Sequence, residues 1–152
     1  MIEIRPDDLS SEEVQALLAL HLAGMHASSP PGTVHALGVA ALTSPDVSVW
    51  TAWREGALAG MGALKALGEG AGEIKSMRTH PDHMRQGVGA ALLEHIIAEA
   101  RARGWRRLSL ETGSGGPFEA ALALYRKRGF EEGAAFGGYQ PGAFNRFFHL
   151  DI

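Results

Sequence analysis

Two glycines near the middle of the chain could bind a phosphate group. Gly87 and Gly89 lie in the segment PDHMRQGVGA at 81–90, directly before a stretch with helical periodicity. Glycine lets the backbone approach a ligand closely, and the first turn of a helix presents unpaired N–H groups and the positive end of its dipole. The segment therefore predicts a site for an anion such as a pyrophosphate. A tight turn that packs a helix onto a sheet would give the same pattern, so both interpretations stay open here.

Length and composition limit the kind of molecule that carries this segment. The chain has 152 residues, 45% of them apolar and 20% charged, so we expect a single domain over residues 1–152. Its net charge is −3 and its basic residues are scattered, which argues against a nucleic-acid partner. No apolar stretch approaches the ~20 residues of a membrane span, and residues 1–6 lack a signal-peptide pattern. We therefore expect a cytoplasmic protein without a membrane partner.

The absence of cysteine removes several kinds of chemistry. It excludes a disulfide framework, a thiolate metal site and a protein thiol nucleophile. An acyl group, if one is transferred, would therefore have to pass directly to its acceptor. The seven histidines contain no His-Glu-x-x-His pattern, so we expect no bound metal.

Hydrophobic periodicity predicts strands and helices on both sides of the glycine segment. Ser10 and Glu13 form a capping-box pattern, which predicts a helix over 11–25. Glu55-Gly56 separates two stretches rich in strand-forming residues and predicts an antiparallel hairpin. The other expected elements are strands over 2–5, 47–53, 58–67, 73–79, 107–112 and 145–150, helices over about 88–103 and 117–128, a loop at 28–32, a short helix over 33–42, and glycine-rich loops at 113–116 and 137–142.

The order of these elements, with two sequence motifs, resembles the GNAT superfamily of acetyltransferases. The glycine segment is followed by a helix, a strand and a second helix that ends in LYRKRGF at 124–130, and the resemblance covers about 73–130. A closer resemblance is to a group of small bacterial GNAT proteins that share EIKSMRT, here at 73–79, and LETG, here at 110–113. The resemblance implies an α/β (α+β) fold of the GNAT acyl-CoA N-acyltransferase type. Its twisted sheet would be mixed but mainly antiparallel, flanked by helices, and splayed where the pantetheine arm enters.

The resemblance further implies that acetyl-CoA is the cosubstrate and that the turn at 81–90 holds its pyrophosphate. Backbone N–H groups would supply most of this site. Two positions depart from the family pattern: Met84 replaces the Arg or Gln that leads the turn motif, and Phe118 replaces an Asn that bonds the pantetheine arm. The residues expected to bind acetyl-CoA are Met77, Arg78, Thr79, Arg85, Gln86, Gly87, Val88, Gly89 and Ala90.

Two residues receive catalytic roles from the same resemblance. Tyr125 would protonate the departing CoA sulfur, because a thiolate leaves more easily when its developing charge is neutralised. An amine is mostly protonated at pH 7 and must lose a proton before it attacks, and Glu73 aligns with the catalytic Glu of several GNAT enzymes. Each residue keeps a structural alternative, since Tyr125 would also suit the apolar face of a helix and Glu73 an exposed strand.

The acceptor side is less sharply indicated. His26 and His35 flank a proline-rich loop where the family usually places acceptor contacts, and either imidazole could act as base or relay. Lys75, Arg78 and Glu111 lie on strands around the expected cleft and could hold an acidic or zwitterionic acceptor. A surface or structural role is the alternative for each of these residues, and the glycine-rich loops could equally close on the substrate.

The resemblance implies an N-acetyltransferase that moves an acetyl group from acetyl-CoA directly to an amine. The simplest acceptor is a small molecule, which the sequence does not identify. A protein N-acetyltransferase, or a non-catalytic acyl-CoA-binding or regulatory module, stays open as an alternative. Family members are often dimers, so a homodimer is also an expectation.

Overall fold

One seven-stranded sheet organises the molecule. The computed structural model describes residues 1–34 and 37–152, and its sheet has the strand order β1-β2-β3-β4-β5-β7-β6. Neighbouring strands pair antiparallel except β4 and β5, which are parallel, so the expected mixed and mainly antiparallel sheet is confirmed. The strands are β1 (Ile2–Pro6), β2 (Val47–Arg54), β3 (Ala57–Gly68), β4 (Ala71–Thr79), β5 (Arg107–Thr112), β6 (Glu131–Glu132) and β7 (Arg146–Asp151).

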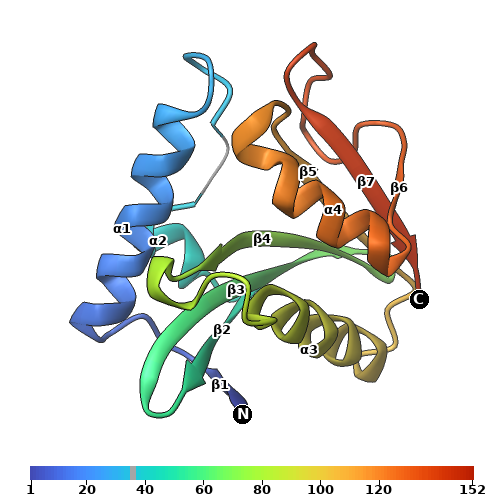
Figure 1. The fold of residues 1–152 in the computed structure, drawn as a ribbon. Helices are drawn as coiled ribbons and strands as arrows, with labels where there is room; N and C mark the ends of the chain where they lie inside the picture. Colours follow the sequence, from blue (N-terminus) through green and yellow to red (C-terminus); the bar gives the residue numbers. More distant parts are fainter. Residues whose placement is uncertain (35–36) are drawn as a thin grey trace.

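Helices cover both faces of the sheet, and each face has its own apolar cluster. One cluster joins the sheet to α3 and α4 and includes Leu92 and Ile96. The other joins it to α1 and α2 and includes Leu17 and Leu18. Figure 1 shows α1 on one side of β4, with α4 on the other side, alongside β5 and β7. The helices are α1 (Glu12–Ala27), α2 (Val39–Leu42), α3 (Val88–Ala102) and α4 (Glu119–Arg128), with short 3₁₀ turns at Pro81–His83 and Gly116–Phe118.

The hairpin between β2 and β3 follows directly from its turn residues. Glu55 and Gly56 both have positive φ, at 51° and 79°, as the mirror-image turns of tight hairpins require. Between 33 and 42 the described residues form a helix only over Val39–Leu42, which is shorter than expected. The two-residue strand β6 was not predicted, because so short an element has no periodicity to detect.

The start of α1 corrects the expected cap. Ser11, not Ser10, caps the helix, and its hydroxyl accepts from the Val14 N–H at 3.3 Å. Ser10 instead donates to the Asp8 carboxylate at 2.6 Å. Both serines suit a cap by type, and the spacing to Glu13 favoured the wrong one. The turn before the helix decides the register, because it places Leu9 in the core at 1% exposure.

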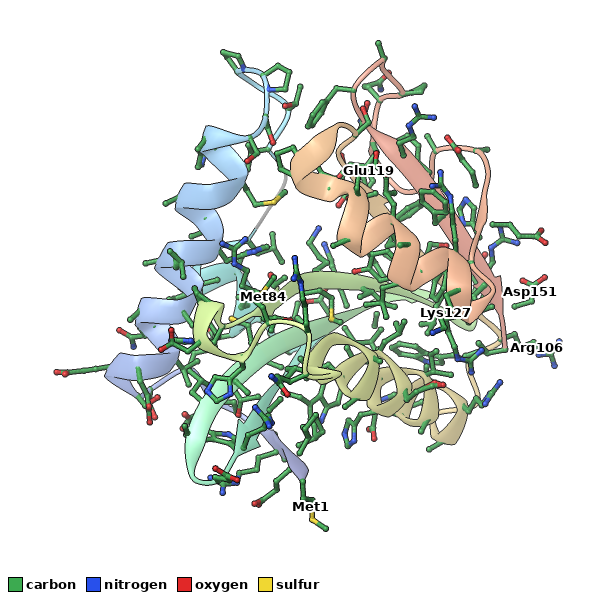
Figure 2. The ribbon with its side chains drawn as sticks, in the orientation of Figure 1. Met1, Met84, Arg106, Glu119, Lys127 and Asp151 are labelled. Atoms are coloured by element: carbon green, nitrogen blue, oxygen red, sulfur yellow. The ribbon has the colours of Figure 1, made fainter. Side chains whose placement is uncertain are left out.

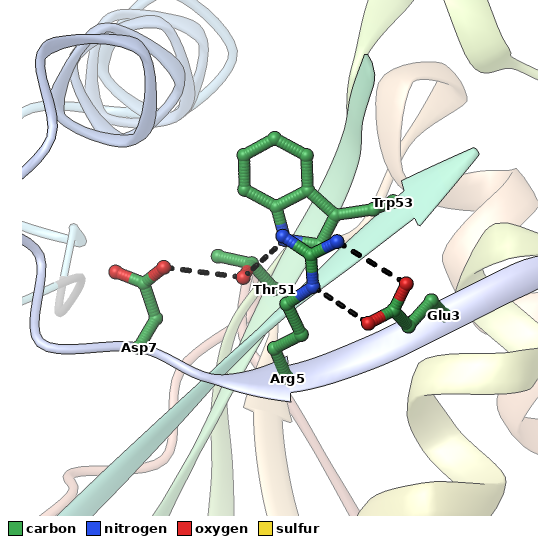
Figure 3. A network of polar contacts seen from close by, with 5 residues as sticks. All are labelled: Glu3, Arg5, Asp7, Thr51 and Trp53. Carbon is green, nitrogen blue, oxygen red and sulfur yellow. Dashed lines mark hydrogen bonds and ion pairs between the residues drawn. The ribbon is translucent and has the colours of Figure 1, made fainter. Parts of the chain in front are cut away.

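The first edge of the sheet is held by a polar network away from the cavities described below (Figure 3). Arg5 pairs with Glu3 at 2.8 Å and lies over the Trp53 ring at 4.9 Å. The indole N–H of Trp53 donates to Thr51 Oγ1 at 2.8 Å, and the Thr51 hydroxyl donates to Asp7 at 3.2 Å. Exposed ion pairs of this kind contribute little to stability, so the network mainly orients β1 against β2.

Strands β4 and β5 separate after a short parallel ladder. Their pairing is confined to residues 71–73 of β4 and 107–109 of β5. The remaining halves of both strands diverge, which matches the splayed sheet that we expected. The Trp105 ring lies over Gly72, where an added Cβ would come within 2.5 Å of the indole. Only glycine fits at this position, so the closed end of the split is packed tightly.

Candidate active site

The turn before α3 leaves backbone donors available. Gly87 and Arg85 both have left-handed φ, at 81° and 61°, and no side chain caps the helix. The first intrahelical bond runs from the Ala91 N–H to the Gly87 carbonyl at 3.0 Å. The N–H groups of residues 88–90 therefore have no partner within the helix, and they form the kind of end that binds anions.

Gly89 has a packing role in addition to any contact with a ligand. A Cβ at this position would come within 3.2 Å of the Leu124 side chain on α4 and 3.9 Å of Thr79 Oγ1 on β4. The glycine thus lets α3 approach both elements. A large residue here would disturb the packing as well as the turn, so substitutions at Gly89 do not isolate anion binding.

Two cavities lie on either side of the split sheet. The α3 cavity, of about 450 Å³, lies between β4, α3 and α4 and is lined by Met77, Arg78, Thr79, Pro81, Met84, Gly89, Leu92, Pro117, Ala120, Ala121, Leu124 and Tyr125. The α1 cavity, of about 340 Å³, lies between α1, β4, β5 and the start of α4. It is lined by Gly24, Met25, Ser28, Ile74, Lys75, Ser76, Met77, Arg78, Leu110, Glu111, Thr112, Pro117, Phe118, Ala121 and Tyr125.

Tyr125 lies where the two cavities meet, because it lines both of them. Its side chain is 5% exposed, and its ring packs edge-on against Phe130 at 5.7 Å between centroids. Burial raises the pKa of the Tyr125 hydroxyl above its ordinary value. The phenol therefore stays protonated at neutral pH and can donate a proton or a hydrogen bond.

A bulge in β4 lies beside Tyr125 and determines which side chains face each cavity. Met61 pairs with Arg78 and Ala63 with Lys75, so Ser76 and Met77 together oppose the single residue Gly62. Ser76 has a φ of 55°, and its buried hydroxyl has no hydrogen-bond partner among the described residues. A bulge interrupts the ladder and leaves backbone groups unpaired. Those groups lie at the junction of the two cavities.

Glu73, Lys75 and the half-buried Tyr139 form a polar trio. Lys75 Nζ donates to Glu73 Oε2 at 3.0 Å and to the Tyr139 hydroxyl at 2.7 Å, and that hydroxyl donates to the same Glu73 oxygen at 2.5 Å. The Glu73 and Lys75 side chains are 5% and 9% exposed. Burial and the hydrogen bond to Glu73 raise the pKa of Tyr139. Of these three residues only Lys75 lines the α1 cavity. Glu73 therefore lies behind Lys75, to which it is hydrogen-bonded.

Arg78 lies on the face of β4 that meets α1. An added Cβ on Gly24 of α1 would come within 3.2 Å of the Arg78 guanidinium. Nearby His21 is 6% exposed, and burial, with a smaller contribution from Arg78, lowers the pKa of His21 to about 4. The His21 ring is therefore neutral at pH 7. Its Nδ1 has no hydrogen-bond partner among the described residues.

The remaining predicted site residues are divided between the α1 cavity, the surface and the turn before α3. Glu111 lines the α1 cavity from β5, opposite β4. His26 is exposed and is not among the residues that line either cavity, although Gly24 and Met25 beside it line the α1 cavity. His35 lies outside the described residues. On the cosubstrate side, Arg85, Gln86, Gly87 and Ala90 are exposed on the turn, whereas Val88 turns its side chain into the core.

Met84 and Phe118, the two departures from the family motif, each line one of the cavities. Met84 is 53% exposed on the turn before α3 (Figure 2) and lines the α3 cavity. Phe118 is 6% exposed, packs edge-on against Phe144 at 5.5 Å, and lines the α1 cavity. Both Phe rings cover Gly113, where an added Cβ would come within 2.4 Å of Phe144. Phe118 is thus an apolar wall where a polar residue was expected.

Sequence reasoning missed Tyr139 and Ser76. Tyr139 is one of only two tyrosines in the chain, and it stands in the glycine-rich segment that was interpreted as a loop. A lone aromatic side chain in such a loop was the available signal. Ser76 gave no signal, because a bulge depends on the pairing between strands. Among residues 1–34 and 37–152, no cluster of three or more His, Cys, Asp or Glu side chains could hold a metal ion, and no helix is long and apolar enough to cross a membrane.

Comparison with known proteins identifies the fold and the chemistry. The pattern of the Acetyltransferase (GNAT) family matches residues 14–130, which is most of the chain. The chain belongs to the GNAT acetyltransferase family. It is 45% identical to the uncharacterized N-acetyltransferase YedL of Escherichia coli over all of this chain and 96% of that protein. It is 48% identical to the uncharacterized N-acetyltransferase YsnE of Bacillus subtilis over 91% of each chain, and 39% identical to an IAA acetyltransferase of Azospirillum brasilense over 78% and 76%.

Solved structures agree with this membership. An acyl-CoA N-acyltransferase of Klebsiella pneumoniae superposes with a TM-score of 0.82 at 29% identity, over 99% of this chain and 97% of that one. A Bacillus subtilis acetyltransferase in complex with CoA has the same fold, with a TM-score of 0.74 at 20% identity over 100% and 99% of the two chains. This GNAT protein is therefore an acetyltransferase that uses an amine acceptor, and membership favours an enzyme over a non-catalytic module.

Proposed function

We propose that residues 1–152 form a single cytoplasmic catalytic domain that transfers an acetyl group from acetyl-CoA directly to the amine of a small molecule. The observation that carries this proposal is the meeting of two cavities at Tyr125, where a donor and an acceptor can approach from opposite sides. The α1 cavity, at about 340 Å³, falls at the small end of the roughly 300–1,000 Å³ range of small-molecule sites. A protein acceptor, which would need an open surface, is the alternative.

Acetyl-CoA would occupy the α3 cavity. Its pyrophosphate would accept hydrogen bonds from the free N–H groups of residues 88–90, and its pantetheine arm would lie against the apolar wall of α4. Solved relatives of this fold with bound CoA and acetyl-CoA support the choice of cosubstrate. The thioester would reach the β4 bulge, where a backbone N–H between Met77 and Thr79 could hold its carbonyl oxygen.

The reaction would pass through direct attack. The acceptor nitrogen bonds to the thioester carbon, the carbon–sulfur bond breaks, and the Tyr125 hydroxyl gives its proton to the sulfur. Tyr125 then regains a proton from solvent. The proton that leaves the amine goes to a base on the α1 side, so the overall reaction yields an N-acetyl product and CoA.

Glu73 is the proposed base, acting through its two partners. Because Glu73 does not line the α1 cavity, a proton would reach it through Lys75 or through the Tyr139 hydroxyl. Glu111 is a second candidate on a separate observation, since its carboxylate belongs to the cavity wall itself. The proposed relay gives the buried Lys75–Glu73 ion pair a role in the reaction.

A screen of amines tests the function. The protein is incubated with acetyl-CoA and amines of different classes, thiol release is followed, and N-acetyl products are identified by mass spectrometry. We expect acceptor-dependent CoA release with at least one small amine. A folded protein that binds acetyl-CoA but releases no thiol above background with any small amine, and acetylates a peptide amine instead, would contradict the small-molecule proposal.

Paired substitutions test the base. Glu73→Gln should lower kcat about 10²-fold at pH 7, with partial recovery at high pH where free amine is abundant, because it removes the proton acceptor. Glu111→Gln, a matched removal of one carboxylate, should leave the pH dependence of kcat unchanged. The reverse pattern would transfer the role to Glu111, and circular dichroism of both variants would exclude misfolding.

A further inference from the structure

We propose that Arg78 binds a carboxylate of the acceptor, so that the substrate is an amine that also carries an acid group, such as an α-amino acid. The inference rests on the proposed function, because it concerns the occupant of the α1 cavity. It goes further by naming the chemical class of that occupant and the residue that recognises it.

The bulge places Arg78 on the acceptor side of β4. Met77 lies on the opposite face, since an added Cβ on Gly62 would come within 2.6 Å of its sulfur and 3.1 Å of Ile96 on α3. Thr79 faces α3 as well, near Gly89. Arg78 instead reaches Gly24 on α1. The guanidinium therefore lies on the wall of the α1 cavity, away from the turn that would hold the pyrophosphate.

Arg78 is the cation of this cavity whose charge has no direct partner within the described chain. Lys75, the other basic residue of the wall, is already paired with Glu73 at 3.0 Å. For the Arg78 side chain, no hydrogen bond or ion pair is formed with any residue of 1–34 or 37–152. A partly buried charge loses hydration and is stabilised by an opposite charge. An acceptor carboxylate would supply that charge.

The chemistry of the guanidinium matches a carboxylate in shape as well as in charge. Its planar fork can donate two parallel hydrogen bonds to one carboxylate, which fixes the orientation of the bound molecule. An α-amino acid bound through its carboxylate would have its nitrogen directed away from Arg78.

Two other roles for Arg78 give different outcomes. The guanidinium lies beside the last turn of α1, where a positive charge favours the helix dipole, so its role could be structural. Arg78 also lines the α3 cavity, so it could contact acetyl-CoA. A structural role predicts equal losses with every acceptor, and a cosubstrate role predicts weaker acetyl-CoA binding.

The test compares α-amino acids with their primary amides, which keep the amine and the side chain but lose the negative charge. Values of kcat and KM are measured for each pair in the wild type, Arg78→Gln and Arg78→Lys. Arg101→Gln, which removes an exposed cation from α3, is the control. Acetyl-CoA affinity is measured by calorimetry in every variant, and binding of each acid and amide to the CoA-saturated protein is measured in the same way.

We expect the wild type to prefer acids over amides by at least about tenfold in kcat/KM, and Arg78→Gln to lose about 10- to 100-fold with acids, chiefly through KM. The kcat/KM for amides should change little in Arg78→Gln, the kcat/KM of Arg78→Lys for acids should fall between those of the wild type and Arg78→Gln, and Arg101→Gln should match the wild type.

Equal losses of kcat/KM for acids and amides, or a tenfold loss of acetyl-CoA affinity in Arg78→Gln, would overturn the inference. Turnover of amides without any preference for acids would overturn it while leaving the acetyltransferase function intact. If no acceptor reacts, calorimetry decides, because equal binding of acids and amides would also overturn it.

Discussion

The two cavities beside β4 differ in the chemical groups that form them. The α3 cavity relies on the free end of a helix, a strand bulge and apolar side chains from α4. The α1 cavity relies on charged side chains, with Lys75, Arg78 and Glu111 on its wall and Glu73 behind it. A backbone site tolerates side-chain changes, which explains how Met84 can stand where the family has a polar residue. A site made of charges depends on each residue, so the α1 cavity, which is the proposed acceptor site, is where relatives of this fold can differ.

The largest effect should come from Tyr125, which lines both cavities. Tyr125→Phe keeps the ring and its contact with Phe130 but removes the hydroxyl, so kcat should fall about 10²-fold while acetyl-CoA affinity stays nearly constant. Because burial raises the pKa of Tyr125, the wild type should show no decline of kcat from its ionisation between pH 7 and 10. The measurement is a pH profile of kcat under conditions where chemistry limits the rate. Wild-type kcat in the variant would make Tyr125 a packing residue and leave the cavities without a common catalytic group.

The next effect concerns stability on the charged side. His21 has a pKa of about 4 in the folded protein and about 6.5 when unfolded, so the unfolded chain gains a proton first as pH falls. The contribution of His21 to stability is therefore fully present above pH 6.5 and is lost toward pH 4. Between pH 7 and 5 the loss should be about 2 kcal/mol, or roughly 30-fold in the unfolding constant.

Urea unfolding at the two pH values measures this loss. His21→Leu should remove most of the difference, because leucine fills a similar space and does not titrate. His26→Gln, on the same helix but exposed, should keep it. Equal pH dependence in wild type and His21→Leu would show that His21 is not the group responsible.

The smallest effect should come from the backbone site, where one side chain matters little. Gln86→Glu adds a negative charge beside the turn and should weaken acetyl-CoA binding by about tenfold or less, through repulsion of the pyrophosphate. The same charge near a helix N-terminus should not lower the melting temperature. Ala98→Glu adds the charge to an exposed position further along α3 and should bind acetyl-CoA as the wild type does. Equal affinities in all three proteins by calorimetry would place the pyrophosphate elsewhere.

How far the sequence predicts this molecule differs between the two sides. The strand at 107–112 and the hairpin turn were predicted at their observed positions, because alternation and turn chemistry are local properties. The cap of α1 was wrong by one residue, since two adjacent serines compete and the buried Leu9 decides between them. The Glu73–Lys75–Tyr139 trio could not be predicted, because Tyr139 lies 66 residues away from Glu73 and only the folded chain brings them together.

The short ladder between β4 and β5 has a mechanical consequence. A sheet that is bonded on one side of a split and open on the other concentrates any applied load on the first bonded residues, which here are Glu73 and Ser109. Only three residue pairs resist further opening, compared with eight between β2 and β3. The Trp105 ring, which packs on Gly72 within this ladder, therefore adds resistance to further separation of the two strands. Under tension β4 and β5 would therefore separate before β2 and β3 do.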